Sequence, residues 1–179
     1  MCLGAMGLAG TYQSNLRKMV LESCREDTER LLEEVIDCFP LLEALSFNNS
    51  DLNLILLSPV SRPEGNILQQ LSTKNAYFPF PSVYFHKIFT PDSRLCHLSK
   101  LELGNSPSTQ LTASFQESVL PVLNIIGGQI THVSLENFKF FDVTSIGRYC
   151  PKLVSLKLSN ILSYCRAENQ KIRSVILFF

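Results

Sequence analysis

Apolar residues recur along this chain with one repeated spacing. The clearest copy, VTSIGRYCPKLVSLKLSN, places Leu153, Leu156 and Leu158 in an LxxLxL pattern. Alternate side chains of a β-strand point to opposite faces. The pattern therefore predicts a short strand in which Leu156 and Leu158 enter a core, while Ser155 and Lys157 stay outside it.

The same spacing occurs at several other places. The segment VIDCFPLLEALSFNN aligns with IGRYCPKLVSLKLSN without a gap, and matches its proline and its final asparagine. Units begin at residues 16, 42, 68, 98, 130, 153 and 172, at intervals of 26, 26, 30, 32, 23 and 19 residues. The first five intervals lie in or near the roughly 20–29 residues of a leucine-rich repeat. The unit at residue 68 is weaker, and the short last interval predicts an incomplete final unit.

The repeat predicts the fold class. One unit cannot bury its apolar face alone, whereas stacked units share a continuous core. We therefore predict an α/β fold, a short or incomplete leucine-rich-repeat solenoid with a curved parallel sheet and helices on the convex side. We expect one domain over residues 1–179, with a flexible start at 1–12, an irregular loop or degenerate repeat at 58–91, and an atypical, truncated end at 161–179.

Helical periodicity appears between the predicted strands. Residues 26–39 carry apolar side chains on one helical face and acidic residues opposite, and Pro40 ends the helix. A second helix is predicted over residues 119–126, closed by the pair Gly127-Gly128 as a glycine stop. A third is predicted over residues 141–149. Residues 58–91 show no clean period and contain five prolines with aromatic residues between them. Such a segment could bind a partner, but we favour the interpretation in which its aromatic side chains fill the core beneath a loop.

Composition excludes several classes of protein. Hydrophobic residues make up 45% and charged residues 18%, which is too apolar for a disordered chain. Sixteen basic residues balance sixteen acidic ones, so no overall charge attracts nucleic acid or an anionic membrane. No stretch approaches the ~18 apolar residues of a membrane helix. The six cysteines form no CxxC pair and sit mostly beside apolar residues, which predicts reduced, buried thiols and a cytoplasmic or nuclear protein.

No motif of catalysis or cofactor binding is present in the sequence. The three histidines, His86, His97 and His132, belong to no HExxH or HxxxH pattern, and no GxSxG, Walker or GxGxxG motif occurs. Cys96 and His97 are adjacent, and adjacent residues in a strand point apart. We therefore expect no enzyme, no metal site and no cofactor.

The predicted strands expose a ladder of polar side chains of mixed charge, suited to a protein surface rather than to a polyanion. Every repeat protein exposes such residues, whether or not it binds a partner there. The candidate protein-binding residues on the concave face are Lys18, Glu22, Ser46, Asn48, Lys100, Glu102, His132, Ser134, Glu136, Ser155 and Lys157.

The string IGRYCPKLVSLKLSN resembles the cysteine-containing leucine-rich repeat of F-box leucine-rich-repeat proteins, through Cys150, Pro151 and Leu153. The match is looser at Phe39-Pro40, and Ile161 stands where that subtype often carries Cys or Asn. The resemblance implies that the repeats hold a protein target for a cullin-type ubiquitin ligase. No F-box is found in this chain, because repeat-like sequence begins by Leu16, so the ligase role would need a longer form.

Two hypotheses of function follow. The first is a protein-binding repeat module, with substrate recognition for a cullin-type ubiquitin ligase as its most specific form. The second is a non-functional fragment or splice product of a longer leucine-rich-repeat protein. The apolar ending SVILFF favours truncation, since solenoids normally close with a polar cap. An uncapped end of this kind also predicts self-association through the C-terminal region.

Overall fold

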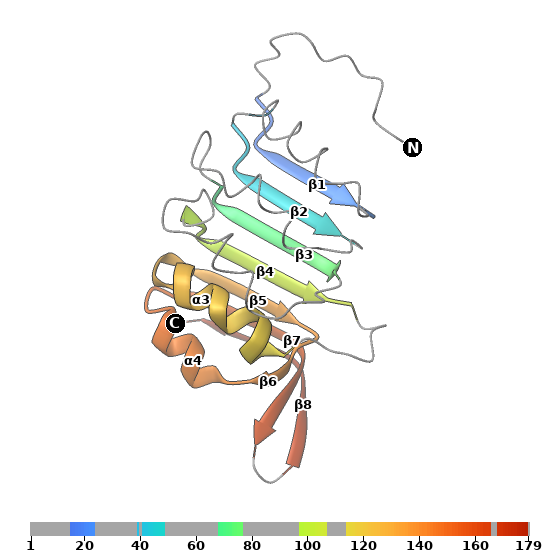
Figure 1. Cartoon of the computed structure of the whole chain (residues 1–179), viewed down its shortest axis with the longest axis vertical. Helices are drawn as coiled ribbons and strands as arrows, with labels where there is room; N and C mark the ends of the chain where they lie inside the picture. Colours follow the sequence, from blue (N-terminus) through green and yellow to red (C-terminus); the bar gives the residue numbers. More distant parts are fainter. Residues whose placement is uncertain are drawn as a thin grey trace.

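A computed structural model of the chain has an α/β fold built on one mixed, mainly parallel sheet (Figure 1). The structure describes residues 15–23, 39, 41–48, 68–76, 97–106, 114–165 and 168–178. The sheet has eight strands, of which seven follow the order β1-β2-β3-β4-β5-β7-β6, and β8 pairs with β7 off this path. Within the described residues, no helix is long and apolar enough to cross a membrane.

Six of the strands, β1 to β5 and β7, lie where the first six apolar units predict them. The bounds of all eight are β1 Lys18–Glu22, β2 Ala44–Asn48, β3 Gln70–Ala76, β4 Lys100–Asn105, β5 His132–Glu136, β6 Lys139–Phe141, β7 Ser155–Cys165 and β8 Glu168–Phe178. From β1 through β5 to β7, neighbouring strands pair in parallel. The strand β3 lies inside the segment 58–91, so this part of that segment has regular structure. Of the rest of the segment, the structure describes only Leu68 and Gln69.

The same backbone hydrogen bonds join each unit to the next. The carbonyl of Arg17 accepts from the amides of Glu43 and Ala44, at 2.8 and 2.9 Å. The carbonyl that precedes each later strand repeats this bond to two successive amides of the following unit. These equivalent carbonyls belong to Glu43, Gln69, Ser99 and Thr131. The repeated bonds hold the strands in register and satisfy backbone groups where each strand begins.

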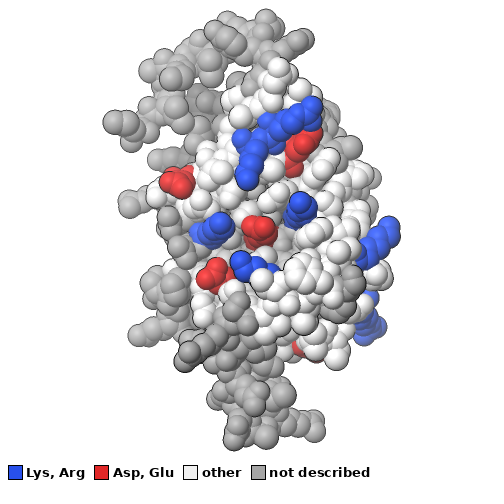
Figure 2. All heavy atoms as spheres, turned by 180° about the vertical axis from the view of Figure 1, so that it is seen from behind, with Lys and Arg blue, Asp and Glu red and all other residues white. Residues whose placement is uncertain are grey.

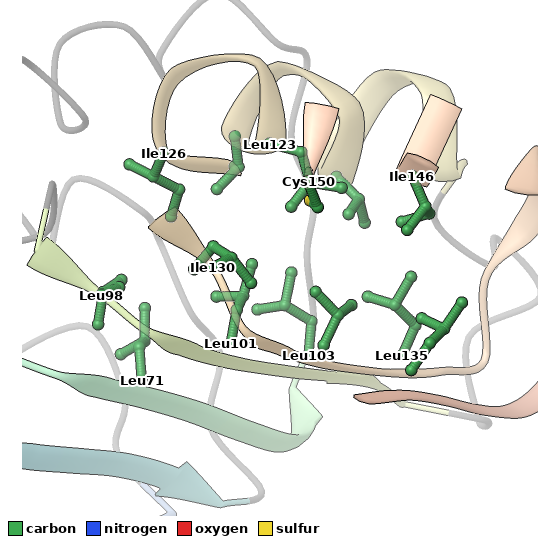
Figure 3. Close-up of a cluster of buried hydrophobic side chains, with 14 of the residues drawn as sticks. Leu71, Leu98, Leu101, Leu103, Leu123, Ile126, Ile130, Leu135, Ile146 and Cys150 are labelled. Atoms are coloured by element: carbon green, nitrogen blue, oxygen red, sulfur yellow. The ribbon is translucent and has the colours of Figure 1, made fainter. Parts of the chain in front are cut away.

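One face of the sheet supplies the core. Leu45, Leu71 and Leu101 stand opposite one another on β2, β3 and β4, and each is at most 1% exposed. Val133 and Leu156 continue this row on β5 and β7. Figure 3 shows side chains of α3 (Leu120–Ile126) and α4 (Val143–Tyr149) pointing toward these strands. Burying such side chains contributes about 1.5–3 kcal/mol each.

The helix predicted over 119–126 is confirmed, but the role predicted for Gly127 and Gly128, a left-handed stop at its end, was wrong. One turn of π-helix, Phe115–Val119, precedes α3, and a short 3-10 helix, Gly127–Gln129, continues from it. Gly127 has φ −61°, so it is no left-handed helix stop. It is instead closely packed, because an added Cβ would lie 2.6 Å from the backbone oxygen of Tyr149.

The helix predicted over 141–149 begins later than the sequence suggested. Phe141 ends the strand β6, and its ring meets that of Phe115 edge-on, with centroids 5.0 Å apart. The carboxylate of Asp142 accepts a hydrogen bond from the amide of Thr144 at 3.0 Å, so Asp142 is the N-cap and α4 starts at Val143. The helix predicted over 26–39 lies outside the described residues, apart from Phe39.

The last apolar unit does not form another parallel strand. The strand β8 returns antiparallel along β7, with Leu158 opposite Val175 and Leu156 opposite Leu177. The interval of 19 residues leaves no length for a helical return segment, so the chain reverses in a hairpin instead. The sequence predicted an incomplete final unit at Ile172, and the structure has its residues in an antiparallel strand rather than in a seventh parallel one.

Candidate functional site

The face of the sheet opposite α3 and α4 carries polar side chains, and we call it the polar face. Strand register arranges these side chains in rows that cross the sheet. One row contains Lys100, His132 and Ser155, and the next contains Glu102, Ser134 and Lys157. Figure 2 shows this face, over which basic and acidic side chains alternate.

A shallow hollow of about 320 Å³ lies on the polar face and spans β3, β4, β5 and β7. Gly104 on β4 stands opposite Glu136 on β5, and its lack of a side chain leaves space in the hollow, which Lys74 of β3 also lines. The residues that line the hollow are Thr73, Lys74, Glu102, Leu103, Gly104, His132, Val133, Ser134, Glu136, Ser155, Lys157 and Ser159.

The eleven residues proposed from the sequence all lie in strands of this sheet. The structure brings six of them together around the hollow, namely Glu102, His132, Ser134, Glu136, Ser155 and Lys157. Five lie outside it, namely Lys18 and Glu22 on β1, Ser46 and Asn48 on β2, and Lys100 on β4.

Sequence analysis missed the contribution of β3. Lys74 and Thr73 line the hollow, and Ser72 contacts one of its carboxylates. The unit at Leu68 was recognised as a weak copy, but its outward positions were not carried into the candidate face. Aligning LQQLSTKN with LSKLELGN would have placed Ser72 opposite Glu102, as the strand register does.

The charged side chains that line the hollow form no ion pairs with one another. Across the described part of the chain, the one ion pair within 4.0 Å joins Arg17 to Glu43, outside the hollow. Along a strand, same-face neighbours such as Lys100 and Glu102 are separated by two residues, about 7 Å. Across the strands, Lys157 stands opposite Ser134 rather than a carboxylate. These charges are therefore available to a partner.

Two hydrogen bonds orient polar groups at the hollow. The hydroxyl of Ser72 donates to Oε2 of Glu102 at 2.9 Å, and Ser72 is only 4% exposed. The hydroxyl of Thr131 lies 2.8 Å from Nδ1 of His132 and 3.0 Å from the carbonyl oxygen of Ser99. The Glu102 carboxylate and the His132 ring are thus held by neighbouring groups, which lowers the entropy cost of binding through them.

The described residues give little support to metal binding or to cysteine or histidine chemistry. Within the described ranges, no three His, Cys, Asp or Glu side chains gather as a metal site would require. Cys150 is buried behind α4, and its burial raises the pKa of the thiol to about 11, so it stays protonated near neutral pH. His97 is exposed and does not line the hollow.

Comparison with protein-family models, with curated proteins and with solved structures finds no match to this chain. The function is therefore proposed from the geometry of the chain itself.

Proposed function

We propose that this chain is a protein-binding module that holds its partner on the polar face of a leucine-rich-repeat solenoid. The observation that carries the proposal is the hollow, where preformed charged side chains from four strands converge without pairing to one another. The repeat interpretation is supported by the identical carbonyl-to-amide bonds at each step. It is also supported by the register that aligns Leu45, Leu71 and Leu101.

The charge pattern favours a protein over a polyanion. Lys74 and Lys157 border the hollow together with Glu102 and Glu136, so both signs meet within four strands, about 15 Å. A phosphate backbone would be repelled by the two carboxylates. A folded protein surface can present basic and acidic groups in the complementary order, which gives specificity and a fast association rate.

The test uses two variants that leave the net charge unchanged. Lys157→Glu with Glu136→Lys reverses two charges that line the hollow, and Lys152→Glu with Glu117→Lys does the same at exposed sites off that face. Each chain is used as bait in cell extract, and captured proteins are identified by mass spectrometry. Circular dichroism and thermal unfolding verify that each bait is folded.

The proposal expects at least one captured protein to be lost with the first variant and kept with the second. The same protein should bind more weakly as salt rises, because the exposed charges are screened within a Debye length of about 8 Å at physiological ionic strength. Equal capture by both variants, or no specific capture by a folded bait, would contradict the proposal. Cullin-ligase components among the proteins lost would assign the ubiquitin-ligase role.

A further inference from the structure

The strand β8 forms one edge of the sheet. It pairs with β7 along its whole length, and no other described strand pairs with it. An edge strand leaves a row of backbone amides and carbonyls that can accept another strand. Natural edges are commonly protected by charged residues or proline. The last part of β8, Ser174–Phe178, contains neither.

The end of β8 is also apolar on both faces. Val175 and Leu177 stand opposite Leu158 and Leu156, on the core side of the sheet. Ile176 and Phe178 lie on the polar face, where they are 52% and 79% exposed. The interior strands alternate apolar and polar residues, so this double apolar character is particular to the edges.

The other edge shares part of this character. Val20 of β1 is 48% exposed on the polar face, and Met19 and Leu21 are only partly buried on the core side. A strand with apolar residues on both faces is typical of a position that is covered on both sides. Two edges of this kind allow either β8 to β8 pairing or β8 to β1 pairing between copies.

We propose that two copies of this chain associate through β8, antiparallel and across a two-fold axis, so that the sheet continues from one copy into the other. A two-fold contact is self-complementary, since the same residues face one another from both copies. Centred on Ile176, this pairing sets Ile176 against its own counterpart and Val175 against Leu177. Ile176 then meets its counterpart on the polar face and Val175 meets Leu177 on the core side, while Phe178 lies opposite Ser174, and the edge hydrogen-bonding groups are paired. The inference is independent of the proposed partner-binding function.

The available length suits a weak dimer. Pairing centred on Ile176 covers Ser174–Phe178, whose five residues span roughly 17 Å at about 3.4 Å per residue. So short a strand pairing buries less than the roughly 800 Å² per partner of a standard specific interface. We therefore expect a dissociation constant on the order of micromolar.

Analytical ultracentrifugation of the full chain over a range of concentrations tests this association. We expect a monomer–dimer equilibrium that is weakened at least about tenfold by Ile176→Lys, because two like charges would face each other across the axis. Val143→Lys is the matched control, since Val143 is also 52% exposed but begins α4. Val20→Lys tests the β1 edge. Both controls should dimerise like the original chain.

Several results would overturn the proposal. These are a chain that stays monomeric at high concentration, growth beyond dimers, a loss of association with Val20→Lys, or equal dimerisation of the Ile176→Lys and Val143→Lys variants. Hydrogen exchange of the unsubstituted chain covers the case in which Ile176→Lys fails to fold. Amides of Ser174–Phe178 should exchange more slowly at high than at low concentration, while those of β4 stay unchanged. An exchange rate in β8 that does not depend on concentration would contradict the dimer.

Discussion

Asn105 and Asn137 bind each other's backbone across neighbouring units of the sheet. The side-chain amide of Asn137 donates to the carbonyl of Asn105 at 2.6 Å, and that of Asn105 donates to the carbonyl of Asn137 at 3.4 Å. Both residues are buried, since Asn105 is 1% exposed and Asn137 is 7% exposed. The pair thus satisfies backbone groups at the end of β4 and just beyond β5, where the chain leaves the ladder.

Asn137 also has a positive φ of 62°, a conformation that asparagine tolerates better than most residues. Asn160 has a similar φ of 51°, but its side chain is exposed. Glycine accepts both conformations, so Asn137→Gly and Asn160→Gly differ mainly in the buried amide. We expect Asn137→Gly to lower the free energy of unfolding by about 1–3 kcal/mol more than Asn160→Gly. Urea unfolding measures the difference, and equal losses would show that the paired amides contribute nothing.

Gly127 and Gly128 offer a second matched pair. A Cβ at Gly127 would meet the backbone oxygen of Tyr149 at 2.6 Å, whereas a Cβ at Gly128 has no atom within 4 Å. We expect Gly127→Ala to destabilise the chain by about 1–3 kcal/mol, because α4 must shift to make room. Gly128→Ala should be neutral or stabilise by up to about 1 kcal/mol. Thermal unfolding of the two variants distinguishes these outcomes, and identical midpoints would refute the packing role of Gly127.

Asp142 links helix capping to pH. Hydrogen bonds from Thr144 and Ser145 hold the pKa of its carboxyl below the usual 3.8. Because the folded-state pKa is lowered, this contribution to stability is present above pH 3.8 and is lost as the pH falls through the folded value. We expect Asp142→Ala to cost about 1 kcal/mol at neutral pH. The free energy of unfolding of both chains should be measured at neutral pH and again below pH 3.8, where the difference between them should shrink. A difference that does not depend on pH would contradict the charged cap.

Cys150 should resist modification in the folded chain. It is 2% exposed, and burial raises the pKa of its thiol from 9.0 to about 11. Since the thiolate is the reactive form, iodoacetamide should label Cys150 slowly at pH 8 and readily after denaturation, as peptide mass spectrometry would show. The raised pKa also means that stability contributed by the buried thiol is lost as pH rises from 9.0 toward 11. Rapid labelling of the folded chain would refute this environment.

Sequence alone determined the strands and the residues that enter the core. The LxxLxL spacing has a period of two within each strand, so one register buries Leu101 and Leu103 and exposes Lys100 and Glu102. This local rule needs no knowledge of the neighbouring chain. It fixed the positions of β1 to β5 and the start of β7, and with them the eleven polar residues of the candidate face.

Only the tertiary structure decided how those strands meet. Strand pairing placed Lys74, from the weak unit at Leu68, around one hollow with Gly104 and Glu136, because side chains far apart in sequence become neighbours across a ladder. Packing gave Gly127 its role through the approach of Tyr149, which no local pattern encodes. The direction of β8 was likewise set by pairing, since the apolar spacing of Ile172, Val175 and Leu177 fits a parallel or an antiparallel neighbour equally well and only the short connection to β7 selects the hairpin.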